Sequence, residues 1–247
     1  MFVSERIERA LHRDAIQRMH ARYALDFIWL GRVQRVLRGA SACTLTAQPD
    51  EHLDHHGTAL VSYDPPMKLV DLADLDADAH EELAHLTLAS AREYGPTWLS
   101  DLAAACGEVA DALGPGKIAR VLLGAGGQPI GWVAVVHDWG GVWELHPLIV
   151  AVEQQRHGYG RRLVREVERL AKAAGARTMI LGTSDTTGAT SLSGVDLYDS
   201  TLARLANVEV RSPHAIDFWR RVGYQIVGIV PDAEGPGMPS ISLARRL

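Results

Sequence analysis

The chain has 247 residues, of which 47% are hydrophobic, so it is long and apolar enough to bury at least one full core. No apolar run approaches the roughly 20 residues of a membrane span, and the first residues lack the pattern of a signal peptide, so we expect a cytoplasmic protein without a membrane partner. Residues 1–66 hold eight Arg, no Lys and eight acidic residues, so the whole net charge of -5 lies in residues 67–247. An acidic domain repels nucleic acid and attracts small polycations.

The sequence divides at Pro65-Pro66. Residues 4–24 and 26–38 have apolar positions at helical intervals, and the sequence from Ser41 to Pro66 is polar and irregular. We therefore expect an N-terminal extension over residues 1–66, helical and then a linker, followed by a domain over residues 67–247.

Neither the cysteines nor the clustered histidines predict a metal site. Cys43 and Cys106 lie in unrelated contexts. His52, His55 and His56 lack an accompanying Cys or second acidic cluster, so we interpret them as part of a solvated linker.

From Met67 onward the pattern alternates as in an α/β domain. The periodicity predicts strands at about 67–72, 117–123, 130–137, 142–151, 178–182, 223–231 and 240–245, and helices at about 77–92, 98–113, 158–174, 195–206 and 213–222. Gly124 to Gln128 form a hairpin turn in this prediction. The strands 142–151 and 178–182, joined by a helix, are expected to be parallel. The result is a mixed sheet.

The strand 142–151 carries the first functional pattern. Because side chains alternate, one face is expected to hold Glu144, His146, Leu148 and Val150, and the other Trp143, Leu145 and Ile149. Pro147 cannot donate to a ladder, which predicts a bulge or a splayed edge beside the parallel neighbour. Unpaired amides would then line a slot, and an extended amide-containing ligand such as a pantetheine arm is able to complete that ladder.

A glycine-broken turn follows this strand and opens the helix 158–174. Gly158 and Gly160 lack a Cβ, and the first-turn N–H groups and the helix dipole point at the same place, which suits a pyrophosphate. The alternative is a tight strand-to-helix turn without a ligand. The pattern favours a nucleotide cofactor.

These motifs resemble the GNAT acetyltransferases, and within them the aminoglycoside 6'-N-acetyltransferases. The acetyl-CoA motif of the superfamily reads here Gln155-Arg156-His157-Gly158-Tyr159-Gly160. The branch resemblance lies in Trp143 to Leu148, Leu181-Gly182-Thr183 with Asp185, Thr190 to Ser193 with Asp196-Leu197-Tyr198, and Gly223-Tyr224 with Ile226-Val227-Gly228 and Val230-Pro231. It implies an α/β (α+β) fold: a GNAT-like mixed, mostly antiparallel sheet flanked by helices, with a splayed parallel strand pair and, ahead of it, the N-terminal helical extension.

The resemblance also implies a co-substrate and catalytic roles. Acetyl-CoA is the expected co-substrate, held by Leu148, Ile149, Val150, Gln155, Arg156, His157, Gly158, Tyr159, Gly160, Arg161 and Trp219. Glu144 matches the favoured general base, His146 lines the same pocket, and the backbone at Leu148 polarises the thioester carbonyl. The chain departs from the family at Trp219, where many GNAT enzymes have a tyrosine that protonates the leaving thiolate.

A polycationic aminoglycoside is the expected acceptor, and carboxylates and an aromatic surface are the expected contacts. The candidates are Glu93, Tyr94, Trp98, Glu144, Asp185 and Asp196. An acetyltransferase for another small-molecule amine or a protein N-terminus, and an acetyl-CoA-binding sensor without turnover, remain alternatives. A homodimer also stays open.

Overall fold

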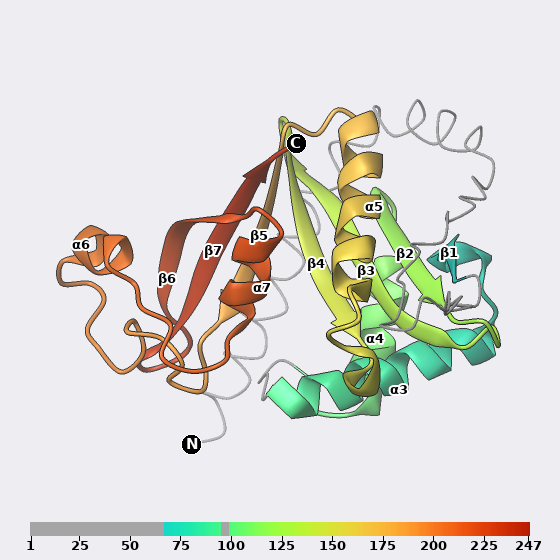
Figure 1. Ribbon diagram of the computed structural model, residues 1–247, viewed down its shortest axis with the longest axis horizontal. Coiled ribbons are helices and arrows are strands. Elements are labelled where there is room, and N and C mark those ends of the chain that lie inside the picture. Colours follow the sequence, from blue (N-terminus) through green and yellow to red (C-terminus); the bar gives the residue numbers. More distant parts are fainter. Residues whose placement is uncertain (1–66, 95–98) are drawn as a thin grey trace, which may run out of the picture. The chain divides into compact units, whose positions relative to one another are not determined.

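The computed structural model of the protein describes residues 67–94 and 99–247 (Figure 1). The predicted extension over residues 1–66, with its histidine cluster, lies outside the described residues. The strands are β1 (Lys68–Asp71), β2 (Lys117–Leu123), β3 (Pro129–Trp139), β4 (Val142–Val150), β5 (Thr178–Ser184), β6 (Gln225–Gly235) and β7 (Met238–Arg246). The helices are η2 (Leu72–Asp74), α3 (Ala77–Tyr94), α4 (Leu102–Ala112), η3 (Val152–Gln154), α5 (Tyr159–Ala173), α6 (Thr201–Ala206) and α7 (Ala215–Arg221).

One seven-stranded sheet has the order β1-β2-β3-β4-β5-β7-β6. Every neighbouring pair is antiparallel except β4 and β5. The turn at Gly124 to Gln128 joins β2 to β3, and the Gly124 N–H donates to the Gln128 carbonyl at 2.9 Å. The predicted fold class, a mixed and mostly antiparallel sheet with one parallel pair, is confirmed.

Helices cover both faces of the sheet, because β2 and β3 bury side chains on both sides. Val121 and Trp132 belong to the core beneath α3 and α4. Ile118, Leu122 and Val133 alternate with these residues and are also buried. The helix α5 packs against β2, β3 and β4, and buries an apolar stripe of Leu163, Val164, Val167, Leu170 and Ala171. Its periodicity therefore predicts its packing.

The parallel pair β4 and β5 separates after three residue pairs. Pairing runs from Val142↔Thr178 to Glu144↔Ile180 and ends there, and Figure 1 shows the two strands diverging from the end where they meet. On the other side of β4, Val133 faces Leu148 and Val135 faces Leu145, so His146 and Pro147 together oppose one residue of β3. The bulge and splay predicted from Pro147 are thus both present.

Two helices differ from their predicted bounds by four residues or more. The helix predicted over 98–113 begins at Leu102, because the Asp101 carboxylate caps it by accepting the Ala104 N–H at 2.9 Å. The helix predicted over 195–206 spans only Thr201–Ala206. Asp196 accepts the Tyr198 N–H at 3.0 Å, and this local turn competes with helix in the preceding residues. Within the described residues, no helix combines the length and apolar character needed to cross a membrane.

Candidate active site

A cleft of about 890 Å³ opens where β4 and β5 separate. It is lined by β4 on one side, by β5 and the hairpin end of β6 and β7 on another, and by residues of α3, α4 and α7. Of the residues predicted from sequence, the cleft brings together Glu144, His146, Leu148, Ile149, Val150, Gln155 and Trp219. Trp143, Leu145 and Ile149 are buried, but the bulge at His146 and Pro147 shifts the alternation. Leu145 and Leu148 oppose Val135 and Val133, which share one face of β3, whereas Ile149 opposes Trp132 on the other face. The predicted placement of Leu148 on the face of Glu144 is therefore wrong.

The end of β4 is held by hydrogen bonds from outside the sheet. The Val150 carbonyl accepts from Ser90 Oγ of α3 at 3.1 Å and from Gln155 Nε2 at 3.2 Å. The next residue, Ala151, instead donates its N–H to Ile130 of β3 at 2.9 Å. Because backbone groups alternate along a strand, the amides of Leu148 and Val150 face the side from which β5 has separated. Both residues therefore present backbone groups to the cleft.

The turn predicted to bind phosphate, residues 155–160, follows β4 and includes the start of α5. Gly158 is the N-cap of α5 with φ of 86°, a left-handed conformation that glycine adopts readily, and no side chain caps the helix. A Cβ at Gly160 would stand 3.3 Å from the Phe218 ring of the segment that carries Trp219. Gly158, Arg156, His157 and Arg161 are exposed, and Tyr159 and Gly160 partly so. The uncapped N–H groups of this first turn are available to an anion.

A second carboxylate, that of Glu108, joins the predicted pair of Glu144 and His146 on β4. Glu108 of α4 lies with its Oε1 3.2 Å from Nε2 of His146, and the Glu108 side chain is only 21% exposed. Burial of the imidazole acts to lower the pKa of His146. The hydrogen bond and charge of Glu108 and the charge of Glu144 outweigh burial and the opposing charge of Lys117, and raise this pKa above 6.5.

The opposite wall carries a third acidic group, Glu234. Ser184 Oγ donates to Oε1 of Glu234 at 2.6 Å. The Nε2 of His214 donates to the Ser184 carbonyl at 3.1 Å, and its Nδ1 accepts the Ile216 N–H at 3.2 Å. One ring nitrogen thus donates a hydrogen bond and the other accepts one.

Trp219 lines the cleft from α7 and is 7% exposed. It packs edge-on against Phe218 and Tyr224, with ring centroids 4.9 Å and 5.2 Å apart. The indole N–H is a hydrogen-bond donor but has no titratable proton near neutral pH.

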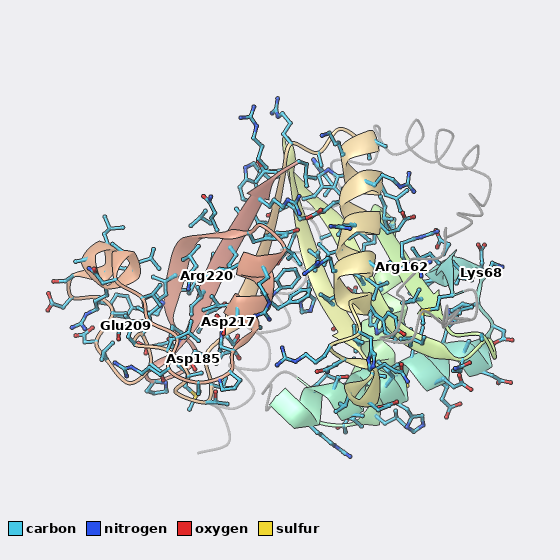
Figure 2. The ribbon with its side chains drawn as sticks, viewed as in Figure 1. Lys68, Arg162, Asp185, Glu209, Asp217 and Arg220 are labelled. Carbon is cyan, nitrogen blue, oxygen red and sulfur yellow. The ribbon has the colours of Figure 1, made fainter. Side chains whose placement is uncertain are left out.

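The remaining predicted acceptor contacts lie away from the cleft or outside the described side chains. Asp185 is fully buried beyond β5, among the loops seen in Figure 2, and accepts from the Ala189 N–H, the Thr190 N–H and Thr190 Oγ1 at 2.7 to 2.8 Å. Burial acts to raise the pKa of Asp185, but these hydrogen bonds outweigh it and lower the pKa. The structure thus gives Asp185 a role in holding its loop.

Asp196 is exposed and caps the local turn at Tyr198. The side chains of Glu93 and Tyr94, and all of Trp98, lie outside what the structure describes. Sequence reasoning missed Ser90, Glu108, Ser184, His214 and Glu234. Each comes from an element distant in sequence from β4, and no local motif marks it.

Residues 90–200 match the family model described as the Acetyltransferase (GNAT) family. The match covers β2 to β5 and α5, so this part of the chain is similar to a GNAT acetyltransferase domain.

Among solved structures, the chain is similar to an aminoglycoside 6'-N-acetyltransferase complexed with coenzyme A, with 28% identity, a TM-score of 0.65 and coverage of 72% of this chain and 96% of that chain. It is similar to the aminoglycoside 6'-N-acetyltransferase from Enterococcus faecium at the same identity and coverage, with a TM-score of 0.62. Aminoglycoside 6'-acetyltransferase type Ii, at 24% identity, the same coverage and a TM-score of 0.52, shares the fold. A comparison with curated proteins found no significant match.

Proposed function

We propose that this enzyme transfers the acetyl group of acetyl-CoA to the 6'-amine of aminoglycoside antibiotics and so confers resistance to them. The observation that carries the acceptor class is the charge of the cleft. Glu108, Glu144 and Glu234 line it from three elements, and none of the described lining residues is Lys or Arg. A cleft of this charge attracts an acceptor with several ammonium groups and repels anions. The similarity to two aminoglycoside 6'-N-acetyltransferases at 28% identity supports the same acceptor.

The cofactor side of the proposal rests on the backbone. The thioester of acetyl-CoA supplies the acyl group when it is bound. The first turn of α5 offers uncapped N–H groups to the pyrophosphate, and the amides of Leu148 and Val150 offer hydrogen bonds to an extended ligand arm and to the thioester carbonyl. The close approach of Gly160 to Phe218 leaves little room for a side chain in the first turn of α5, where the pyrophosphate is expected. The described residues therefore fit this co-substrate.

The chemistry requires a proton acceptor. An alkyl amine has a pKa of about 10, so the acceptor arrives protonated near neutral pH and has no electron pair for attack. Glu144 lines the cleft, and we assign it as the base, acting directly or through a water. The tetrahedral intermediate that follows carries its charge toward the amides of the β4 segment.

The test is the acetyl-CoA-dependent release of free thiol by the purified full chain. Kanamycin or tobramycin should be acetylated at the 6'-amine, and gentamicin C1, whose 6'-nitrogen is methylated, should be a poorer acceptor. The matched control is an aminoglycoside with a 6'-hydroxyl in place of the amine. Equal modification of that control contradicts the 6' assignment. Thiol release with simple amines or peptides but not with kanamycin contradicts the acceptor class, and no turnover with any amine would leave binding as the function.

A further inference from the structure

Glu108 is placed by its helix to reach β4. The helix α4 buries Ala105, Val109 and Ala112 in the core, and Glu108 lies at the border of this buried face. Its carboxylate lines the cleft together with Glu144, although the two residues come from different elements. The contact between Glu108 and β4 is therefore fixed by packing of the whole helix.

The contact defines which nitrogen of His146 carries a proton. A carboxylate only accepts hydrogen bonds, so the 3.2 Å approach of Glu108 Oε1 to Nε2 places the hydrogen on Nε2. The charged groups that act on this imidazole are Glu108 of α4, Glu144 of β4 and Lys117 of β2. The two carboxylates dominate, so a protonated imidazole is stabilised here. The His146 side chain is also 53% exposed, which opens a route from the cleft to solvent.

We propose that Glu108 is a positioning residue for His146, and that this pair takes up the proton that the acceptor amine releases. The amine N–H bond breaks as an O–H bond forms on Glu144, and the freed electron pair of nitrogen would attack the thioester carbonyl. A C–N bond would form, the C–S bond would break, and CoA would leave as a thiolate that takes a proton from water. The proton then leaves Glu144 and forms an N–H bond on His146, which becomes imidazolium and returns the proton to solvent. Glu108 stabilises that imidazolium. The inference rests on acetyl transfer in this cleft, and holds for any amine acceptor.

The pairing can be measured without an acceptor. In an NMR titration, the His146 signals are assigned by their loss in His146→Gln. We expect a wild-type pKa above 6.5, and a fall of about one unit in Glu108→Gln, because an opposite charge at this distance shifts a pKa by about one to three units. Glu209→Gln is the control: it removes one carboxylate from an exposed position between α6 and α7, away from the cleft (Figure 2), and should leave the titration unchanged.

Kinetics test the proton route. Because His146 must be neutral to accept a proton, kcat/KM for kanamycin should fall as the pH drops through the His146 pKa. Glu108→Gln should move this limb toward acid by the same pH interval, and His146→Gln should lose roughly 10²-fold in turnover. Glu108→Gln should add nothing in the His146→Gln background, since it acts through the imidazole.

Opposite results would overturn the inference. An unchanged His146 titration in Glu108→Gln, or equal and additive losses in the double variant, would leave Glu108 with a structural role only. If Glu108→Gln does not fold, the wild-type titration decides, and a pKa at or below 6.5 refutes the pairing. If kanamycin is not acetylated, the acceptor proposal fails, whereas the NMR titration of His146 still tests the pairing of Glu108 with His146.

Discussion

Replacing Asp185 by Asn should destabilise the protein while leaving the chemistry of the cleft intact. One carboxylate oxygen of Asp185 accepts the Ala189 N–H, and the other accepts both the N–H and the hydroxyl of Thr190. The amide of Asn has only one acceptor oxygen, so its NH₂ must face at least one of these donors. Leaving a buried donor unsatisfied costs about 1–3 kcal/mol. At about 2–4 °C per kcal/mol for a domain of this size, the melting temperature should fall by about 2–12 °C.

The stability lost in Asp185→Asn should depend on pH in a definite direction. The folded pKa of Asp185 is lowered from 3.8, so its carboxylate adds stability above that value and loses it as the pH falls through the folded pKa. The difference in unfolding free energy between wild type and Asp185→Asn should therefore be constant between about pH 5 and 7, and should shrink below about pH 4. Urea denaturation at a series of pH values measures it, and Asp199→Asn, a charge loss at an exposed loop residue, is the control.

The same variant decides between two roles of Asp185. The loop that Asp185 holds includes Thr186 and Thr187, which line the cleft, so a rise in acceptor KM should accompany the loss of stability. A rise in KM with an unchanged melting temperature and no pH-dependent difference would refute the role in the loop, and would restore the sequence-based prediction that Asp185 contacts the acceptor.

Three further substitutions test the cleft itself. Glu144→Gln should lower turnover by roughly 10²-fold and leave acetyl-CoA affinity in calorimetry nearly unchanged; an unaltered rate across the pH range assigns the base elsewhere. Gly160→Asp should abolish acetyl-CoA binding, because its Cβ would stand 3.3 Å from the Phe218 ring and its charge would repel the pyrophosphate. Retained affinity would mean that the pyrophosphate does not bind at the first turn of α5. Trp219→Tyr should keep or raise turnover, since a phenol can donate a proton. The smaller side chain leaves a void that should lower the free energy of unfolding by about 1–3 kcal/mol. A large loss of turnover without a change in melting temperature would mean that Trp219 itself contacts a substrate.

The predictable features of this fold depend on local sequence. The helix α5 shows its apolar stripe in the spacing of residues such as Leu163 and Val167. Simple alternation predicts the faces of β4 only up to the bulge, beyond which Leu148 lies on the face of Leu145. Pro147 marks the bulge because it lacks the N–H of a ladder. The bounds of α6 were wrong because Asp196 forms a competing turn, and helical spacing alone does not register such a hydrogen bond.

The two sides of the cleft differ in how far a family resemblance extends to them. The cofactor side consists of backbone groups of β4 and the first turn of α5, and any sequence that forms this strand, turn and helix presents nearly the same N–H groups. The acceptor side consists of side chains such as Glu108, His214 and Glu234, which come from α4, the start of α7 and the end of β6. Loops and element ends vary most among proteins of one fold and carry specificity. The backbone therefore supports acetyl-CoA strongly, whereas the acceptor depends on contacts between residues far apart in sequence, such as the pairing of Glu108 with His146. Acceptor assays consequently discriminate more sharply between amine classes than any change at the cofactor turn.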